Sequence, residues 1–286
     1  MRLARFFLAT ALAIASCTPR NRGPAPGADP QPAEESVNSG KLAAEFPLLP
    51  MIEKSLWRQL LEAEAKLAAA DPPARPAANK EVERLTAKLQ SRHPFHVSPG
   101  RLDLGGIVFN KSSARFSVPA TVHYPDAGDS RHPGELELLL CTESGRAHET
   151  LFVTAARPLH LELLLHLTGH AKGPQGRRFR IEVLTMEGER IPVESLIRVQ
   201  GTESVKFPLL WEFSGSDFND TYSPDLSGDF AIFWHAHDTV LRVDHEGIAS
   251  SVVKLTPVPH PMLKNGMPVI LEMIPDQSVD ETRPRP

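Results

Sequence analysis

The spacing of apolar residues changes near Pro94, and this change constrains the fold more than any other feature of the chain. From Met51 to Ala70 apolar side chains recur at steps of three and four, which places them on one face of a helix. Beyond Pro94 apolar and polar residues alternate with period two, as in Phe116 to Val122, which is typical of half-buried strands. The sequence therefore predicts an α+β fold: a mostly β domain with hairpins and one core helix, preceded by a short helical segment.

Two helices are predicted in the helical segment, which we assign to residues 41–93. The first runs from Met51 to Ala70 and ends at Asp71-Pro72-Pro73, because proline interrupts a helix. The second runs from Asn79, as its N-cap, to Ser91. The two helices could form a hairpin packed on the domain or a separate stalk.

Two hairpins and one helix are predicted inside the domain, which we assign to residues 94–275. One hairpin turns at Glu143–Arg146 and the other at Glu187-Gly188, each between runs of apolar residues. Between them, Thr154 to Gly169 carries a leucine stripe, with Pro158 in the first turn and Gly169 where a helix commonly ends. This segment is the predicted core helix.

The N-terminus has the pattern of a signal peptide. Arg2 and Arg5 precede the apolar run Phe6–Ile14, and the small residues Ala15 and Ser16 precede Cys17. A cysteine at this place predicts a bacterial lipoprotein signal over residues 1–16, with lipidation at Cys17; an ordinary secreted protein is the alternative. The apolar run is too short to span a bilayer, which needs about 20 residues.

Two polar segments flank the predicted folded regions. Residues 17–40 are rich in Pro, Gly, Ala and Ser, which predicts a disordered tether, and residues 276–286 form a polar tail. With acyl chains at Cys17, we expect a membrane-anchored protein of the bacterial cell envelope that faces the periplasm or the exterior.

Cysteine count and charge exclude several classes of protein. With Cys17 lipidated, Cys141 has no intramolecular partner, so neither a disulfide framework nor an iron–sulfur cluster is expected. The formal net charge is −4, which argues against nonspecific binding of nucleic acid.

One candidate reactive pair follows from the first hairpin. If its loop is centred on Ser144-Gly145, Cys141 lies opposite His148, with Cβ atoms roughly 4.5–5.5 Å apart. A thiol and an imidazole at that distance could form an activated nucleophile. The alternative is a buried, structural cysteine, which is the more common case.

One candidate metal site lies at His235 and His237. On a strand these two histidines share a face and could supply two ligands to zinc or copper. No complete set of ligands is visible in the sequence, so the alternative is a solvent-facing pair and no cofactor.

Several segments resemble the YdjY-like domain family. They are Cys141–Thr150 with the following run to Pro158, Trp211–Phe218, Ser227–Ile232, Arg115–Ala120 and Pro268–Pro275. The resemblance covers nearly all of Gly100 to Pro275 and implies one folded unit in an envelope protein, often a lipoprotein. It implies no established activity and carries over no catalytic residue, and Trp234–His237 departs from the family's pattern.

These observations favour a lipid-anchored, noncatalytic binding or interaction module. Its expected partners are the membrane, through Cys17, and an envelope protein or polymer. The sequence holds no complete catalytic set, so whether the chain is an enzyme stays open, and a metal-dependent (Zn or Cu) or thiol-dependent function is the alternative.

Overall fold

The computed structural model describes residues 39–125, 134–200, 205, 207–218, 221–234, 238–245, 248 and 253–276. Its α-helices are α2 (Ser39–Glu45), α3 (Leu49–Ile52), α4 (Lys54–Ala69), α5 (Arg75–Arg92), α6 (Pro158–Leu167) and α7 (Ser223–Ser227), with two 3-10 turns, η1 (Ala147–Glu149) and η2 (Val193–Leu196). Its strands are β1 (Phe95–Ser98), β2 (Arg101–Leu104), β3 (Ile107–Asn110), β4 (Arg115–Val122), β5 (Leu138–Thr142), β6 (Thr150–Thr154), β7 (Phe179–Leu184), β8 (Arg190–Pro192), β9 (Ile197–Val199), β10 (Trp211–Phe213), β11 (Asp229–Ile232), β12 (Leu241–Val243), β13 (Leu255–Pro257) and β14 (Pro268–Pro275). The predicted α+β class, mostly β, is confirmed.

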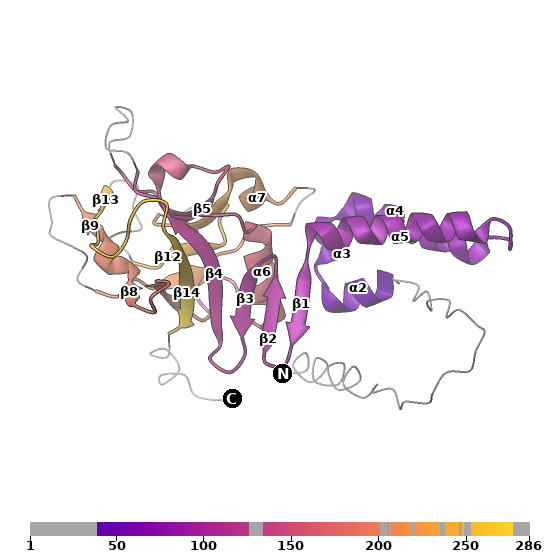
Figure 1. Ribbon diagram of the computed structural model, residues 1–286, viewed down its shortest axis with the longest axis horizontal. Helices are drawn as coiled ribbons and strands as arrows, with labels where there is room; N and C mark the ends of the chain where they lie inside the picture. The colour runs from indigo at the N-terminus through magenta and orange to yellow at the C-terminus, as the bar shows by residue number, and fades with distance from the viewer. Residues whose placement is uncertain are drawn as a thin grey trace, which may run out of the picture.

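Eight of the strands close into a ring. Their hydrogen-bonded order is β4, β14, β7, β10, β12, β11, β5 and β6, and β6 pairs again with β4. One part of β4 also pairs with β3, from which β2 and β1 continue as a meander (Figure 1). Strand β4 alternates between buried and less buried residues over Phe116–Val122, as its period-two pattern predicts.

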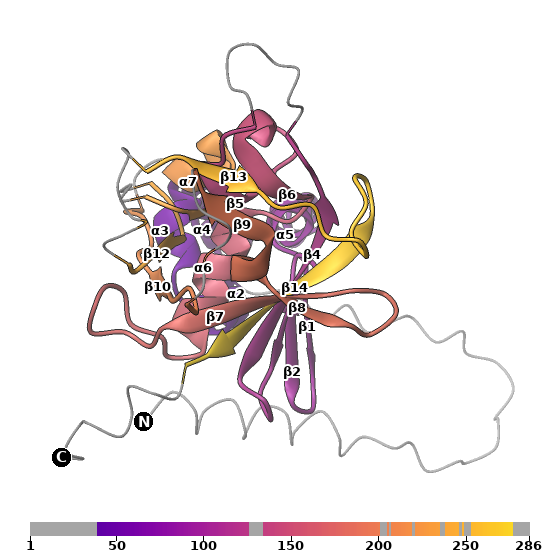
Figure 2. The same cartoon turned by 90° about the vertical axis from the view of Figure 1, so that its left-hand side faces the viewer.

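The strands of the ring surround helix α6 (Figure 2). Every residue from Pro158 to Leu165 is buried, which is expected of a helix that is apolar on nearly all sides. Rings from three strands surround its C-terminal end: His166 contacts Phe213 of β10, and His170 contacts Phe116 of β4 and Phe179 of β7. Gly169 adopts a φ of +83°, so the helix ends in the left-handed conformation that its glycine permits.

Helices α4 and α5 form a hairpin that we call the arm (residues 54–92). It extends away from the strands, to the right in Figure 1. The two helices bury a narrow seam between them, made by Leu56, Trp57, Leu60, Ala63, Val82, Leu85, Thr86 and Leu89.

The start of α5 differs from the sequence prediction. The helix begins at Arg75 with Pro76 in its first turn, where a missing N–H breaks no helical bond. Asn79, predicted as the N-cap, instead lies inside the helix and donates a hydrogen bond from Nδ2 to Glu83 Oε1 at 2.6 Å.

The root of the arm is joined to α6 by polar groups, of which His93 and His160 are buried. Glu53, between α3 and α4, contacts Arg92 Nη1 at 2.8 Å and His93 Nε2 at 3.3 Å, and the His93 hydrogen bond is the main cause that lowers the pKa of Glu53 to about 2. The rings of His93 and His160 meet edge to face at 5.5 Å. His160 Nε2 and Arg157 Nη1 both contact the carbonyl oxygen of Arg92, at 3.2 and 3.1 Å.

Candidate functional site

The first candidate site lies where β5 and β6 end, in front of the N-terminus of α6. The two strands are parallel, and their last residues, Thr142 and Thr154, are register partners. Loops that follow neighbouring parallel strands leave from the same edge of a sheet, so they meet and frame a crevice. The first loop is residues 143–146, and the second is residues 155–157, which lead into α6.

This parallel pairing contradicts the hairpin predicted around Ser144-Gly145. The register partner of Cys141 is Val153, and His148 lies in the turn η1 with about half of its side chain exposed. Cys141 and His148 are therefore not cross-strand neighbours. The sequence prediction used the local turn signal and did not include β11, which takes the other edge of β5.

Arg146 holds the connecting segment against β5. Its guanidinium pairs with Asp229 of β11 at 3.0 Å, with Glu149 at 3.5 Å and, at shorter range, with Glu137. Burial of Asp229 raises its pKa although Arg146 lowers it. One guanidinium thus binds three carboxylates from separate segments, which directs residues 143–149 back along β5 instead of into an antiparallel strand.

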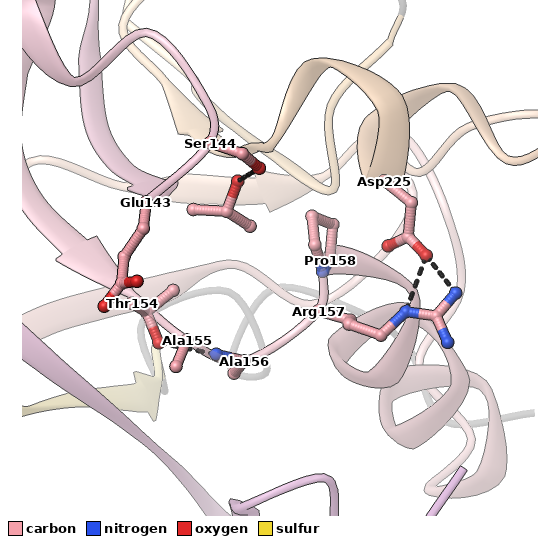
Figure 3. Close-up of a pocket in the computed structure, with 9 residues that line it drawn as sticks. Glu143, Ser144, Thr154, Ala155, Ala156, Arg157, Pro158 and Asp225 are labelled. Carbon is pink, nitrogen blue, oxygen red and sulfur yellow. Dashed lines mark hydrogen bonds and ion pairs between the residues drawn. The ribbon is translucent and has the colours of Figure 1, made fainter. Parts of the chain in front are cut away.

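The pocket between the two loops has a volume of about 490 Å³. Its lining mixes polar side chains with an apolar strip, and it comprises Thr142, Glu143, Ser144, Thr154, Ala155, Ala156, Arg157, Pro158 and Asp225. In Figure 3, Glu143 and Ser144 lie on one side of the pocket, and Arg157 with Asp225 lies on the other. We refer to it as the β5–β6 pocket.

An ion pair forms one wall of the β5–β6 pocket. Arg157 Nε donates to Asp225 Oδ2 at 2.9 Å, and Arg157 Nη2 contacts the same oxygen (Figure 3). The other carboxylate oxygen, Oδ1, accepts the backbone N–H of Leu159 at 3.0 Å. A carboxylate at a helix N-terminus is stabilised by the helix dipole, so Asp225 occupies the place that an external anion would take.

The hydroxyl groups of the β5–β6 pocket differ in how many hydrogen bonds they already form within the protein. Thr154 Oγ1 donates to the Pro119 carbonyl and accepts the backbone N–H of Ala156, so both of its roles are filled. Thr142 Oγ1 and Ser144 Oγ lie 3.1 Å apart and share one hydrogen bond. Glu143 and Ser144 are exposed, so a ligand could contact both side chains.

Cys141 precedes Thr142 on β5 and is fully buried. It packs in a small cluster with Leu138 and Ile232. Burial raises the pKa of its thiol to about 11, against a hydrogen bond with Thr150 that lowers it. At neutral pH the group is therefore a thiol, which is a poor nucleophile compared with a thiolate.

A second polar cluster surrounds the buried Glu162 of α6, and it was not predicted from the sequence. Glu162 accepts hydrogen bonds from the Tyr222 hydroxyl and from the backbone N–H of Ser216 at 3.0 Å, and it pairs with Lys172 Nζ at 2.6 Å. Burial alone would raise the pKa of Glu162, but the hydrogen bonds from His166, Lys172 and Tyr222 outweigh it and lower that pKa. Burial raises the pKa of Tyr222 well above its ordinary value. The carboxylate is therefore ionised and the phenol is protonated.

The polar groups around Glu162 hold a loop in place and bond mainly to one another. Lys172 Nζ also donates to the carbonyl oxygen of Ser216 at 2.6 Å and lies over the rings of Phe213 and Phe218. Gly215 has a φ of +61°, a conformation that favours glycine, and it crosses the lysine so closely that a Cβ would lie 2.3 Å from Lys172 Cε. A small adjoining pocket of about 260 Å³ is lined by serines, Lys172, Asp217 and Asp238.

The remaining predicted site residues are not all within the described part of the chain. His235, His237 and Cys17 lie outside it. Within the described ranges, no group of three or more His, Cys, Asp or Glu side chains is placed to hold a metal ion. Each helix in those same ranges is too short or too polar to traverse a bilayer.

Comparison with known proteins found no match to this chain among family models, curated proteins or solved structures.

Proposed function

We propose that this chain is a lipid-anchored protein of the bacterial envelope and that its α+β domain is a noncatalytic binding module. The β5–β6 pocket carries this proposal, because two parallel strands and a helix converge there on an open crevice that presents both polar and apolar groups. The lipoprotein-type sequence around Cys17 and the resemblance to YdjY-like domains support the envelope location.

The lining of the β5–β6 pocket suits a hydroxyl-bearing ligand such as a segment of an envelope polysaccharide. Glu143 supplies acceptors, Thr142 and Ser144 supply hydroxyls that both donate and accept, and Arg157 supplies donors. The helix N-terminus is already filled by Asp225, so the pocket does not favour a simple anion. Its volume of about 490 Å³ leaves room for one or two sugar units.

Binding can be measured by titrating size-separated oligosaccharides from the envelope into the protein in a calorimeter. Exchanging Glu143→Gln together with Ser144→Ala should weaken binding about tenfold or more, because a charged hydrogen bond and a hydroxyl contact are lost. The matched control is Glu187→Gln with Ser195→Ala, which alters an exposed glutamate and an exposed serine far from the pocket. Equal loss in both variants, or no binding by the wild type, would contradict the proposal.

Anchoring has its own test. Cys17→Ser should block acylation and move the protein from the membrane fraction to the soluble or unprocessed fraction. The lipid anchor would be refuted if the wild-type protein carried no acyl group and if the wild type and Cys17→Ser sedimented with membranes to the same extent.

A further inference from the structure

Helix α5 carries a row of basic side chains that winds about a third of the way round the helix. Lys80, Arg84, Lys88 and Arg92 follow one another at intervals of four residues, and all four are exposed. Residues four apart on a helix are neighbours on its surface, so these side chains form a continuous stripe. With a rise of 1.5 Å per residue, the stripe covers about 18 Å of the helix.

The stripe belongs to a part of the chain whose charge is opposite to that of the domain. Residues 54–92 contain eight basic and five acidic side chains, a net charge of +3. Residues 94–276 contain 16 basic and 23 acidic side chains, a net charge of −7. The molecule is therefore a cationic arm on an anionic domain.

Most of the stripe does not serve the stability of the helix, although Arg92 lies in the last turn of α5, where the helix dipole favours a cation. Like charges four residues apart repel one another and destabilise a helix. Arg84 is partly neutralised by Glu81 and Arg92 by Glu53, at 2.7 and 2.8 Å. The apolar seam with α4 uses other positions of α5, such as Val82, Leu85 and Leu89, so the stripe is not needed to hold the arm together.

The arm extends away from the domain, and the stripe runs from the outer part of α5 at Lys80 to its root at Arg92. Figure 1 shows α4 and α5 extending well beyond the strands, with their connecting turn at the far end. An extended cationic helix is therefore presented on a protein that, under the proposed function, is attached to a bilayer.

We infer that the stripe Lys80–Arg84–Lys88–Arg92 docks on anionic lipid headgroups of the membrane that anchors the protein. This inference rests on the proposed lipid anchor. Each basic residue near an anionic surface is attracted by about 1 kcal/mol, which corresponds to about a fivefold gain in binding. The same surface repels the −7 domain, so the arm lies toward the bilayer and the domain is held away from it.

The experiment uses the chain from Thr18 to Pro286, which keeps every described residue and has no acyl group. Binding to phosphatidylcholine vesicles with and without phosphatidylglycerol is measured by sedimentation. The test variant is K80Q/R84Q/K88Q, which leaves Arg92 and its contacts at the root intact. The control is R101Q/K111Q/K264Q, which removes three exposed basic groups from the domain instead.

We expect the wild-type chain to bind the phosphatidylglycerol vesicles and to lose this binding as salt is raised. The test variant should bind them roughly 100-fold less tightly, and the control variant should bind as the wild type does. Equal binding by the test variant and the wild type, or binding only to a soluble anionic polysaccharide, would overturn the inference. Because no acyl group is present, this result is independent of the Cys17→Ser fractionation that tests the anchor.

Discussion

The arm and the β domain achieve their stability in different ways. The arm is built from contacts close in sequence: two helices, one turn and a narrow apolar seam, with its charged groups on the surface. The domain depends on pairings between distant segments, such as β4 with β14, and encloses the ionised Glu162. Charged groups near the arm's surface can therefore serve a partner, whereas those inside the domain are needed for the fold.

The difference matters most at the root, where the two regions meet. There Arg92, the last residue of α5, offers its carbonyl oxygen to His160 and to Arg157. Arg157 also forms a wall of the β5–β6 pocket. Arg157 thus contacts the arm, helix α6 and the candidate ligand site.

Removing one acidic group from each region gives the sharpest contrast. Glu162→Ala should lower the free energy of unfolding by about 3–5 kcal/mol, because Lys172 and the Tyr222 hydroxyl lose their buried partner. Glu81→Ala, which breaks an exposed pair with Arg84 on the arm, should leave unfolding by urea unchanged. Comparable losses in the two variants would show that the arm also depends on its charges.

Acid should destabilise the domain through one buried and one partly buried histidine, His160 and His170. Burial lowers the pKa of His160 to about 3 and that of His170 to about 4, against an ordinary value of 6.5. Below pH 6.5 the unfolded chain binds protons that the folded chain does not, so stability is complete above pH 6.5 and falls as the pH drops toward these values. At pH 5 each histidine should cost about 2 kcal/mol.

Urea denaturation at several pH values checks this expectation. His160→Gln should remove about half of the loss between pH 8 and pH 5. His96→Gln, which changes an exposed histidine of β1, should leave the pH profile as it is. A wild-type profile that is flat down to pH 5 would mean that the histidines titrate normally in the folded protein.

Much of the fold could be predicted because its signals are local. The leucine run, Pro158 and Gly169 identified α6 to within a few residues, although β6 takes Thr154 and the helix begins at Pro158. The turn at Glu187-Gly188 was also correct, since β7 and β8 pair there as a hairpin. In each case the residues that determine the element lie within it.

The β5–β6 pocket could not be predicted, because the residues that form it are distant in sequence. Ser144-Gly145 has the composition of a hairpin turn, but Asp229, more than 80 residues later, binds Arg146 and helps to direct the segment back along β5. The predicted antiparallel pairing placed Cys141 opposite His148. It therefore gave no indication that Thr142 and Thr154 are neighbours. One signal was available and was not used: Glu162 is the one acidic residue in the leucine run, which predicts a buried carboxylate that needs partners.

Cys141→Ala should show the smallest effect of these changes, and substitutions at Cys141 test whether its thiol is structural or reactive. Cys141→Ser should cost about 1–3 kcal/mol, because a hydroxyl would be buried among Leu138 and Ile232, and Cys141→Ala should cost about 1 kcal/mol or less. Alkylation of the native thiol should be slow, since burial both blocks access and raises its pKa to about 11. His148→Ala should leave the alkylation rate unchanged, because His148 lies in η1 and not opposite Cys141. Fast alkylation at neutral pH that His148→Ala suppresses would instead require a rearranged β5–β6 segment and would support a thiol-dependent function.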